Sequence, residues 1–564
     1  MIKIFKMRKL LITILFVCFC SCENNSKKIS AAVVSARIEA SSIGVDIMKK
    51  GGNAFDAMVA TDLALSVCYP NAGNIGGGGF LVYRTKTGEV GSLDFREKAP
   101  SKAYEKMFIN PEGYIAKNKS TTGGLSVGVP GTVAGLFEVH GKLCSMPFED
   151  LIQPAIDLAR NGFIVTEKQA KSLNKYQEDF ISLNGQETFY GRRFSKGDTI
   201  ININMAKTLE KIKLIGKDGF YKGMIANKII ESIESSGGIM TLEDLKNYKA
   251  IWRKPLSFSY KNLTVHSMGL PSSGGICLAQ MLSMIEPYDI SQYSPNSTKA
   301  VQIMVESERR SFADRSKFLG DPDFNEIPVD ILLSKDYLKK RMSSFSFNSA
   351  TPSKDLNPGT ISWKESDQTT HYSIIDMNGN AVSVTTTLNG NYGSKLFVEE
   401  GGFFLNNEMD DFSIKPGEPN MYGLVGGVVN KIAPNKRMLS SMTPTIVEEN
   451  GELALVLGSP GGSSIITSVF QVILNVFEFD MEVKQAIENP RFHHQWVPEY
   501  IDLEPNTFSK KTVDELREKK YSIDRKRDRF IGRVDAIRVT KEGSIIPAPD
   551  KRGDDAEATI MSID

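Results

Sequence analysis

The chain has 564 residues, of which 41% are hydrophobic and 24% are charged, as in a soluble globular protein. These proportions exclude a disordered, a collagen-like or a polytopic membrane chain. Lysine and arginine number 68 and acidic residues 67, a net charge of +1, so the chain lacks the basic excess usual in proteins that grip nucleic acid by its phosphates.

The first predicted element is an export signal. Residues 3–9 carry four basic side chains, and residues 10–20 form an apolar run too short to span a bilayer. Ser21 and Cys22 follow, which resembles a bacterial lipoprotein signal. We predict a signal peptide over residues 1–21, a lipid on Cys22 as the only membrane contact, and an exported bacterial protein, periplasmic or anchored to the outer membrane. Plain secretion and a buried amino-terminal helix are the alternatives.

Three cysteines remain beyond the signal: Cys68, Cys144 and Cys277. They form neither a CxxC pair nor an even disulfide framework. We therefore expect small buried apolar side chains, and not a nucleophile or a zinc site.

Residues 30–70 are predicted to be helical. The helix over 40–50 ends at Gly51-Gly52, and Asn53 can cap a second helix that runs through Val67. The glycine run Gly76–Gly79 superficially resembles a phosphate loop, but it lacks the GxxxxGK[ST] pattern and a strand-like segment follows it. We interpret it as close backbone packing or the wall of a site.

In the rest of the chain, the predicted secondary structure changes from mostly helices to short strands. Residues 130–345 show mostly helical patterns, residues 346–363 are rich in Ser, Asn and Pro and indicate a loop, and short strands follow from about residue 369. The length allows up to about four domains, although large single cores often exceed that estimate.

A β-hairpin is predicted over residues 369–387. A two-residue turn would pair Met377 with Asn380, whereas a three-residue loop with Gly379 in the left-handed region would pair Asp376 with Asn380. The second register separates apolar from polar side chains and is favoured for that reason. It places Thr369 opposite Thr387. By periodicity alone, the Ser/Thr face would be an ordinary solvated sheet face.

The segment Asp367–Ser373 resembles the cleavage-and-nucleophile segment of gamma-glutamyltransferases, also called glutathione hydrolases. Further motifs of that family occur in the same order along nearly the whole chain: Gly51–Ala54, Gly76–Phe80, Asp94–Glu97, Asn406–Phe412, Ser440–Pro444, Gly458–Gly462 and Asn489–His494.

This resemblance implies an α+β fold of the amino-terminal-nucleophile hydrolase type, a four-layer αββα sandwich. It also implies self-cleavage between Gln368 and Thr369, giving fragments 22–368 and 369–564 that stay together as a heterodimer within one domain. Cleavage would give Thr369 a free α-amine beside its own hydroxyl. Such an amine has a reference pKa of about 7.7–8.0, suited to accept the hydroxyl proton.

The resemblance also assigns the substrate-binding residues. Arg96, Ser440 and Ser441 would bind the α-carboxylate of a γ-glutamyl group, and Glu408 and Asp411, with Asn389 beside them, would accept its α-ammonium. Bacterial relatives often carry Gln in place of Glu408. The plainer alternatives are a surface salt bridge for Arg96, turn residues for the serines and a capping acidic pair.

The remaining assignments concern catalysis. Gly461 and Gly462 match an oxyanion hole, with a plain tight turn as the alternative, and Thr387 is expected to contact Thr369. Tyr422 matches the aromatic of a lid loop over residues 416–423, with a static surface loop as the alternative. We expect His493-His494 not to bind zinc, and His371 to be a polar strand residue and not a general base.

The sequence thus predicts a self-processing gamma-glutamyl hydrolase and transferase without a cofactor. Glutathione or another γ-glutamyl compound would be the donor, and water, an amino acid or a peptide the acceptor; no nucleic-acid partner is expected. The alternatives are a related acylase such as a cephalosporin acylase, a poly-γ-glutamate processing enzyme and a non-catalytic surface lipoprotein.

Overall fold

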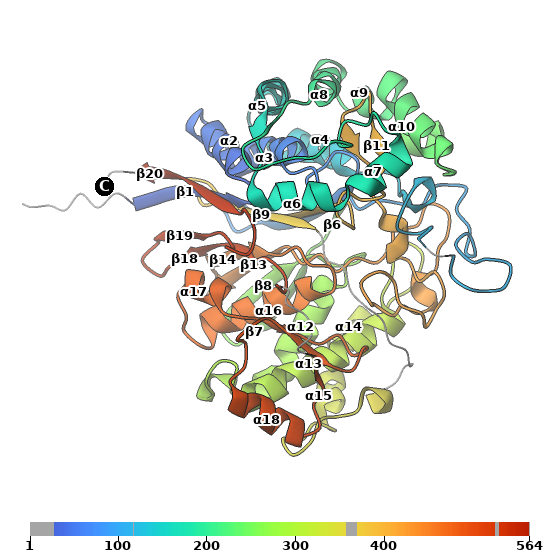
Figure 1. The fold of residues 1–564 in the computed structure, drawn as a ribbon. Helices are drawn as coiled ribbons and strands as arrows, with labels where there is room; N and C mark the ends of the chain where they lie inside the picture. Colours follow the sequence, from blue (N-terminus) through green and yellow to red (C-terminus); the bar gives the residue numbers. More distant parts are fainter. Residues whose placement is uncertain (1–27, 117, 357–368, 525–529, 563–564) are drawn as a thin grey trace, which may run out of the picture.

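The computed structural model describes residues 28–116, 118–356, 369–524 and 530–562. Two antiparallel sheets face each other, and helices cover the outer face of each (Figure 1). The seven-stranded sheet runs in the order β20 (Ala556–Ser562), β1 (Lys28–Ser35), β9 (Thr370–Ile375), β10 (Ala381–Thr387), β2 (Gly78–Arg84), β3 (Val90–Asp94) and β6 (Ile251–Arg253). The six-stranded sheet runs in the order β19 (Ile545–Ala548), β18 (Asp535–Val539), β14 (Glu452–Gly458), β13 (Thr445–Glu449), β8 (Leu263–Ser267) and β7 (Leu256–Tyr260).

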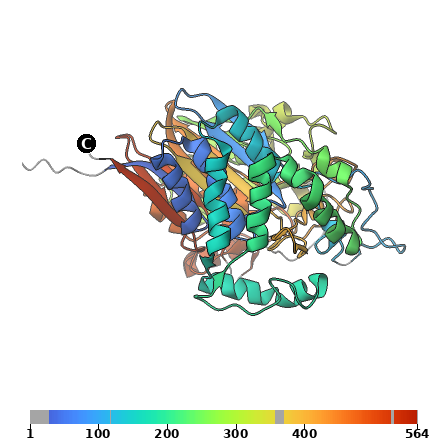
Figure 2. The same ribbon diagram turned by 90° about the horizontal axis from the view of Figure 1, so that it is seen from above.

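Helices from the first half of the chain surround the seven-stranded sheet: most cover its outer face, and the two helices over residues 167–184 lie along its side (Figure 2). They are α2 (Ile38–Lys49), α3 (Ala54–Cys68), α4 (Thr132–Leu143), α5 (Phe148–Asn161), α6 (Glu167–Lys175), α7 (Gln177–Asn184), α8 (Ile203–Ile215), α9 (Asp218–Tyr221), α10 (Gly223–Ser235) and α11 (Leu242–Lys246). The opposite layer holds α12 (Gly274–Ile285), α13 (Thr298–Phe318), α14 (Val329–Leu332), α15 (Lys335–Met342), α16 (Ser464–Phe477), α17 (Val483–Glu488) and α18 (Lys510–Glu518). The αββα prediction is therefore correct.

Three apolar layers hold these four structural layers together. One fills the space between the seven-stranded sheet and its helices, and a second does the same for the six-stranded sheet. A third, smaller cluster lies between the sheets and includes Val34 of β1, Val82 of β2, Ile446 of β13 and Ile537 of β18. A strand with both faces buried removes more apolar surface from water than a strand with one solvated face. The hydrophobic effect therefore favours this closed sandwich.

The helix predictions near the amino terminus are confirmed in part. Helix α2 ends at Lys49 before Gly51, whose φ of +98° is the left-handed conformation of a helix stop. The side chain of Asn53 accepts hydrogen bonds from the amides of Phe55 and Asp56 at the start of α3. The helical prediction is wrong for residues 30–35, which belong to the buried strand β1, where pairing with β20 and β9 outweighs local helix propensity.

The hairpin has the register of the three-residue loop. Strands β9 and β10 pair Ile375 with Ala381, and the Asp376 amide donates to the Asn380 carbonyl at 3.1 Å. Gly379 has the left-handed φ of +85° that this loop requires. The same register places Thr369 opposite Thr387, at the far end of the hairpin from the turn.

The polar face of this hairpin is buried and not solvated, so the plain interpretation of a solvated Ser/Thr face is wrong. The hydroxyl of Ser383 donates to the Leu457 carbonyl at 2.9 Å, and the hydroxyl of Ser373 donates to the Asp535 carbonyl at 3.1 Å. These bonds join the two sheets, which explains why small hydroxyl side chains occupy that face.

The glycine run Gly76–Gly79 is confirmed as a place of close backbone packing. A Cβ atom on Gly77 would lie 2.0 Å from the Thr387 carbonyl oxygen, and one on Gly79 would lie 2.4 Å from that of Thr385. Any larger side chain would therefore push β2 away from β10 beside Thr387.

Strand β1 enters the sheet at the end opposite Thr369. It runs antiparallel to β9, with Val34 beside Ser373 and Ala32 beside Ile375, so Lys28 lies beyond the hairpin turn. Lys28 and Gly379 accordingly line one cleft at that end of the sheets.

Candidate active site

A small cavity opens where β9 begins and β10 ends. It gathers most of the residues that the sequence assigned to the site. Its lining consists of Arg96, Thr369, Thr387, Asn389, Asp411, Tyr422, Leu424, Ser440, Ser441, Met442, Gly462 and Ile465. Two assigned residues, Glu408 and Gly461, do not line the cavity. Glu408 contacts Arg96, and Gly461 immediately precedes Gly462.

Thr369 is 4% exposed and lies directly before the first residue of β9. Opposite it, the Thr387 hydroxyl accepts a 2.7 Å hydrogen bond from the Asn389 amide. Asn389 has a φ of +72°, which turns the chain sharply after β10 and brings its side chain to the cavity. Gln368 lies outside the described residues, so cleavage before Thr369 stays a prediction, as does a direct contact between Thr369 and Thr387.

Arg96 is the centre of a buried charge cluster. Its Nη1 lies 2.5 Å from Oε2 of Glu408, and its Nη2 lies 2.6 Å from Oδ2 of Asp411. The Arg96 side chain is 1% exposed, so the surface salt-bridge alternative is wrong. Burial raises the pKa of Glu408 and of Asp411, and the charge of Arg96 opposes that rise.

This pairing differs from the sequence-based picture, which gave Arg96 to a substrate carboxylate and the two acids to a substrate ammonium. In the structure Arg96 instead pairs with both acids, because separate buried charges are costly. A ligand carrying both an ammonium and a carboxylate can replace this pairing charge for charge. The cluster is therefore chemically suited to the zwitterionic end of a γ-glutamyl group.

The glycine loop after β14 reaches the cavity edge, where Gly462 lines the cavity and Gly461 precedes it. Gly461 has a φ of +133° and Gly462 a φ of +55°, conformations that favour glycine. Among the described residues, no acceptor for either amide is found. The loop leads into helix α16, whose amino-terminal end also favours negative charge.

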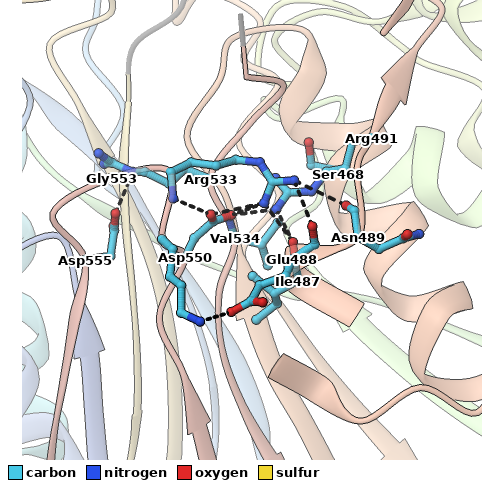
Figure 3. A network of polar contacts seen from close by, with 12 residues as sticks. Ser468, Ile487, Glu488, Asn489, Arg491, Arg533, Val534, Asp550, Gly553 and Asp555 are labelled. Atoms are coloured by element: carbon cyan, nitrogen blue, oxygen red, sulfur yellow. Dashed lines mark hydrogen bonds and ion pairs between the residues drawn. The ribbon is translucent and has the colours of Figure 1, made fainter. Parts of the chain in front are cut away.

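A polar network behind this loop fixes its shape (Figure 3). The Arg533 amide donates to the Ser459 hydroxyl at 2.9 Å, and a Cβ atom on Gly461 would lie 3.0 Å from the Gly532 Cα atom. Oδ2 of Asp550 accepts from Arg491 at 2.6 Å and from the Val534 amide at 2.8 Å. The buried pair of Arg491 and Asp550 thus holds the 531–534 segment against the glycine loop.

Tyr422 forms part of the cavity wall. Its side chain is buried, and a Cβ atom on Gly462 would lie 2.4 Å from its ring, so the ring lies directly against that glycine. Asn420 fastens the loop to the charge cluster: its Nδ2 donates to Oδ1 of Asp411 at 3.0 Å, and its Oδ1 accepts from the Tyr422 and Leu424 amides.

His371 and His493 are both buried among hydrogen-bonding side chains. His371 is fully buried between the hydroxyls of Thr385 and Ser373, and burial lowers its pKa to about 3. His493 bonds Thr467 and Gln495, and burial lowers its pKa to about 4. Across the described ranges, no group of three or more His, Cys, Asp or Glu side chains is placed to hold a metal ion.

Sequence reasoning missed two polar residues of the site. Asn420 lies inside the lid motif, where its position next to Tyr422 could have marked it. Arg315 lies on α13 and donates to the Ser441 hydroxyl at 3.2 Å. Nothing in its local sequence distinguishes it from the charged residues around it.

Comparison with known proteins agrees with this geometry. A family model described as gamma-glutamyltranspeptidase matches residues 40–560. The glutathione hydrolase proenzyme of Escherichia coli (strain K12) is 45% identical over 527 residues, which cover 93% of this chain and 90% of that protein. The proenzyme of the same name from Pseudomonas aeruginosa is 41% identical, with 91% of each chain covered.

Two solved structures resemble the fold. The gamma-glutamyltranspeptidase of Helicobacter pylori has a TM-score of 0.56 and 41% identity, covering 58% of this chain and 94% of its own. A cephalosporin acylase from Bacillus halodurans has a TM-score of 0.81 over 94% of this chain and 96% of its own, but only 23% identity. The second likeness concerns the fold alone.

Two facing sheets between helical layers, with a threonine before a central strand at the cavity, define an amino-terminal-nucleophile hydrolase. Within that class, the chain belongs to the gamma-glutamyltranspeptidase family, a family of enzymes. The sequence-based predictions of fold class, family and enzymatic nature are thereby confirmed.

Proposed function

We propose that the protein is a self-processing glutathione hydrolase and gamma-glutamyltransferase in which Thr369 is the nucleophile. One observation carries this proposal. A single cavity joins Thr369, Gly462 of the glycine loop and Arg96, whose buried guanidinium pairs with the carboxylates of Glu408 and Asp411. That arrangement matches a substrate that has an amide at one end and both an ammonium and a carboxylate at the other.

The proposed reaction has two half-reactions. The Thr369 hydroxyl oxygen adds to the γ-carbonyl carbon, and its proton passes to the α-amine that cleavage exposes on the same residue. The amides of Gly461 and Gly462 stabilise the oxyanion. The C–N bond then breaks, the amine leaves with the transferred proton, and an ester to Thr369 remains. Water releases glutamate from that ester, or an acceptor amine forms a new γ-glutamyl amide.

Glutathione is the proposed donor, supported by the names of the relatives above. Arg96, Ser440 and Ser441 are proposed to bind its α-carboxylate, and Glu408, Asp411 and Asn389 its α-ammonium. Amino acids or short peptides are the proposed acceptors. A related acylase with this fold would have no use for two buried carboxylates that can receive an ammonium, so the cluster favours the γ-glutamyl donor.

Substrate preference tests this proposal. Steady-state hydrolysis of glutathione and γ-glutamyl p-nitroanilide is compared with that of glutaryl p-nitroanilide, which lacks the ammonium. We expect kcat/KM to favour the γ-glutamyl compounds, because the glutaryl compound leaves the two carboxylates without a partner. Preference for the glutaryl compound would defeat the assignment in favour of an acylase.

Processing is tested separately. Purified protein is expected to separate on a denaturing gel into two fragments, the smaller of which begins at Thr369 on amino-terminal sequencing. Thr369→Ala is expected to stay in one piece and to be inactive, because it has no hydroxyl to attack the preceding carbonyl. Cleavage of that variant, or a different first residue, would contradict the mechanism.

We also propose export with a lipid on Cys22, although residues 1–27 lie outside the described residues. No helix in the described ranges is long and apolar enough to cross a membrane. Intact-mass analysis of the mature protein, with Cys22→Ser and Cys20→Ser compared, tests the lipid. Only the Cys22 variant is expected to lose the added acyl mass and to leave the membrane fraction.

A further inference from the structure

Arg315 is a buried cation that has no carboxylate in contact with it among the described residues. It lies near the end of α13, and its side chain is 4% exposed. On the same helix, Arg309 and Arg310 are equally buried, and both form ion pairs with Glu306. Among the described residues, Arg315 has no carboxylate within ion-pair distance. Asp411 attracts it only from beyond that distance. A buried guanidinium without a carboxylate in contact is costly, so it calls for an explanation.

The contacts of Arg315 lead to the two serines of the cavity. Its Nη2 donates to the Ser441 hydroxyl oxygen at 3.2 Å, and its Nε donates to the Ser273 hydroxyl oxygen at 2.9 Å. Ser273 in turn donates to the Ser440 carbonyl, from its hydroxyl at 2.6 Å and from its amide at 2.8 Å. One guanidinium therefore holds Ser441 directly and Ser440 through Ser273.

The hydroxyl oxygens of both serines act as acceptors within the protein. A hydroxyl has one hydrogen to donate. The Ser441 oxygen accepts from Arg315, and the Ser440 oxygen accepts from the Met442 amide at 3.1 Å. Within the described ranges, neither hydroxyl donates to a protein acceptor. Both side chains line the cavity, so each has a hydrogen available for an acceptor inside it.

We propose that Arg315 is a positioning residue that makes this part of the cavity specific for a carboxylate. It turns the Ser441 hydroxyl toward the ligand, supports Ser440 through Ser273 and adds a positive charge that no contacting side chain neutralises. A neutral acceptor would gain two hydrogen bonds here, whereas an anion gains those bonds and the attraction of Arg315 as well. The inference rests on the proposed function, because it concerns the carboxylate of the same donor.

Three p-nitroanilide donors separate the contribution of the carboxylate from that of the ammonium. The γ-glutamyl compound has both charged groups, the glutaryl compound keeps only the carboxylate, and the 4-aminobutyryl compound keeps only the ammonium. For Arg315→Gln we expect kcat/KM to fall about 10- to 100-fold for the two carboxylate-bearing donors, mainly through KM. We expect a change of less than about twofold for the 4-aminobutyryl donor.

Two further variants sharpen the comparison. Arg315→Lys keeps the charge but cannot make both bonds, so a smaller loss with the same donor pattern is expected. Arg309→Gln on the same helix removes a buried arginine that bonds Glu499 and Ser353, away from the cavity. It is expected to lower the melting temperature without changing the relative kcat/KM of the three donors.

Equal losses on all three donors in Arg315→Gln would overturn the proposal, because they would indicate a structural role alone. If that variant does not fold, Ser273→Ala tests the same link with a smaller change. If the wild-type enzyme hydrolyses the 4-aminobutyryl donor too slowly, inhibition constants of glutaric acid monoamide and 4-aminobutanamide replace the rates, and only the constant of the monoamide is expected to rise. A wild-type enzyme that does not require the carboxylate would instead refute the proposed donor class.

Discussion

The Tyr422 hydroxyl donates a 2.5 Å hydrogen bond to the backbone carbonyl of Asn389. The aromatic side chain is thereby fastened to another residue of the cavity wall. Because the same ring lies against Gly462, one side chain spans from the proposed ammonium site to the proposed oxyanion hole. We therefore expect this ring to cover a bound substrate and this bond to hold it in that covered state.

Tyr422→Phe removes the hydroxyl and keeps the ring against Gly462. A typical hydrogen bond contributes about 0.5–1.5 kcal/mol net, so the covered state should lose about two- to tenfold in population. We expect kcat/KM for glutathione to fall by that factor, mostly through KM, in steady-state assays. Tyr422→Ala should lose more because the ring is gone as well. Wild-type kinetics in both variants would show that the loop does not cover bound substrate.

Gly462→Ala tests the oxyanion hole. The added Cβ atom would lie 2.4 Å from the Tyr422 ring, on a residue with a φ of +55°, so the amide must move. Loss of one oxyanion donor typically costs about 10²- to 10³-fold in kcat, and we expect a fall in that range. Gly451→Ala is the control, with a φ of +88° and open space around the added atom. It should cost about 1–2 kcal/mol of stability and leave kcat unchanged.

Glu408→Gln removes one negative charge beside Arg96 without changing the shape of the side chain. We expect the preference for γ-glutamyl over glutaryl p-nitroanilide, measured as a ratio of kcat/KM, to shrink about tenfold, because a charged acceptor binds an ammonium more strongly than a neutral one. Asp410→Asn is the matched control. Asp410 lies in the same short turn but bonds Ser120 and the Met421 amide. An unchanged ratio in Glu408→Gln would exclude Glu408 from ammonium binding.

His371 should make the fold sensitive to acid. Its pKa is lowered to about 3 in the folded protein, against about 6.5 in an unfolded chain. Below pH 6.5 the unfolded state takes up a proton that the folded state refuses, so stability falls with pH. At pH 5 this single group should cost about 2 kcal/mol relative to pH 7.5.

Urea unfolding at the two pH values measures this effect. In His371→Asn the difference between the midpoints should shrink, while His140→Gln, at a half-buried helix position, should keep the wild-type difference. An undiminished difference in the His371 variant would assign the acid sensitivity to other groups.

The parts of the fold that could be predicted are those with a strong local signal. The hairpin register followed from alternating side chains and from Gly379, and α3 followed from the cap at Asn53. Strand β1 could not be predicted, because its Ala- and Val-rich sequence suits a helix as well as a strand buried on both faces. Its partner β20 is more than 500 residues away in sequence.

The sequence predicted which residues form the site, but it did not predict which of their side chains contact one another. The motifs placed Arg96, Asp411 and Thr369 in one cavity, as the structure has them. They did not indicate that Arg96 pairs with Glu408 and Asp411, because the expected roles assume a bound substrate. The role of Arg315 could not be predicted from the sequence for another reason. The charged residues of α13 are nearly all buried, whereas such a sequence ordinarily indicates a solvated helix face.

The place where β1 enters the sheet has a consequence for an attached enzyme. Lys28 and Thr369 lie at opposite ends of the central strands, which span roughly 20 Å at about 3.3 Å per residue. If Cys22 carries the proposed lipid, the protein would be attached to the membrane at the end of the sheets that is opposite the cavity. The cavity opening would then face the solvent, and small peptides could reach it without passing between protein and lipid.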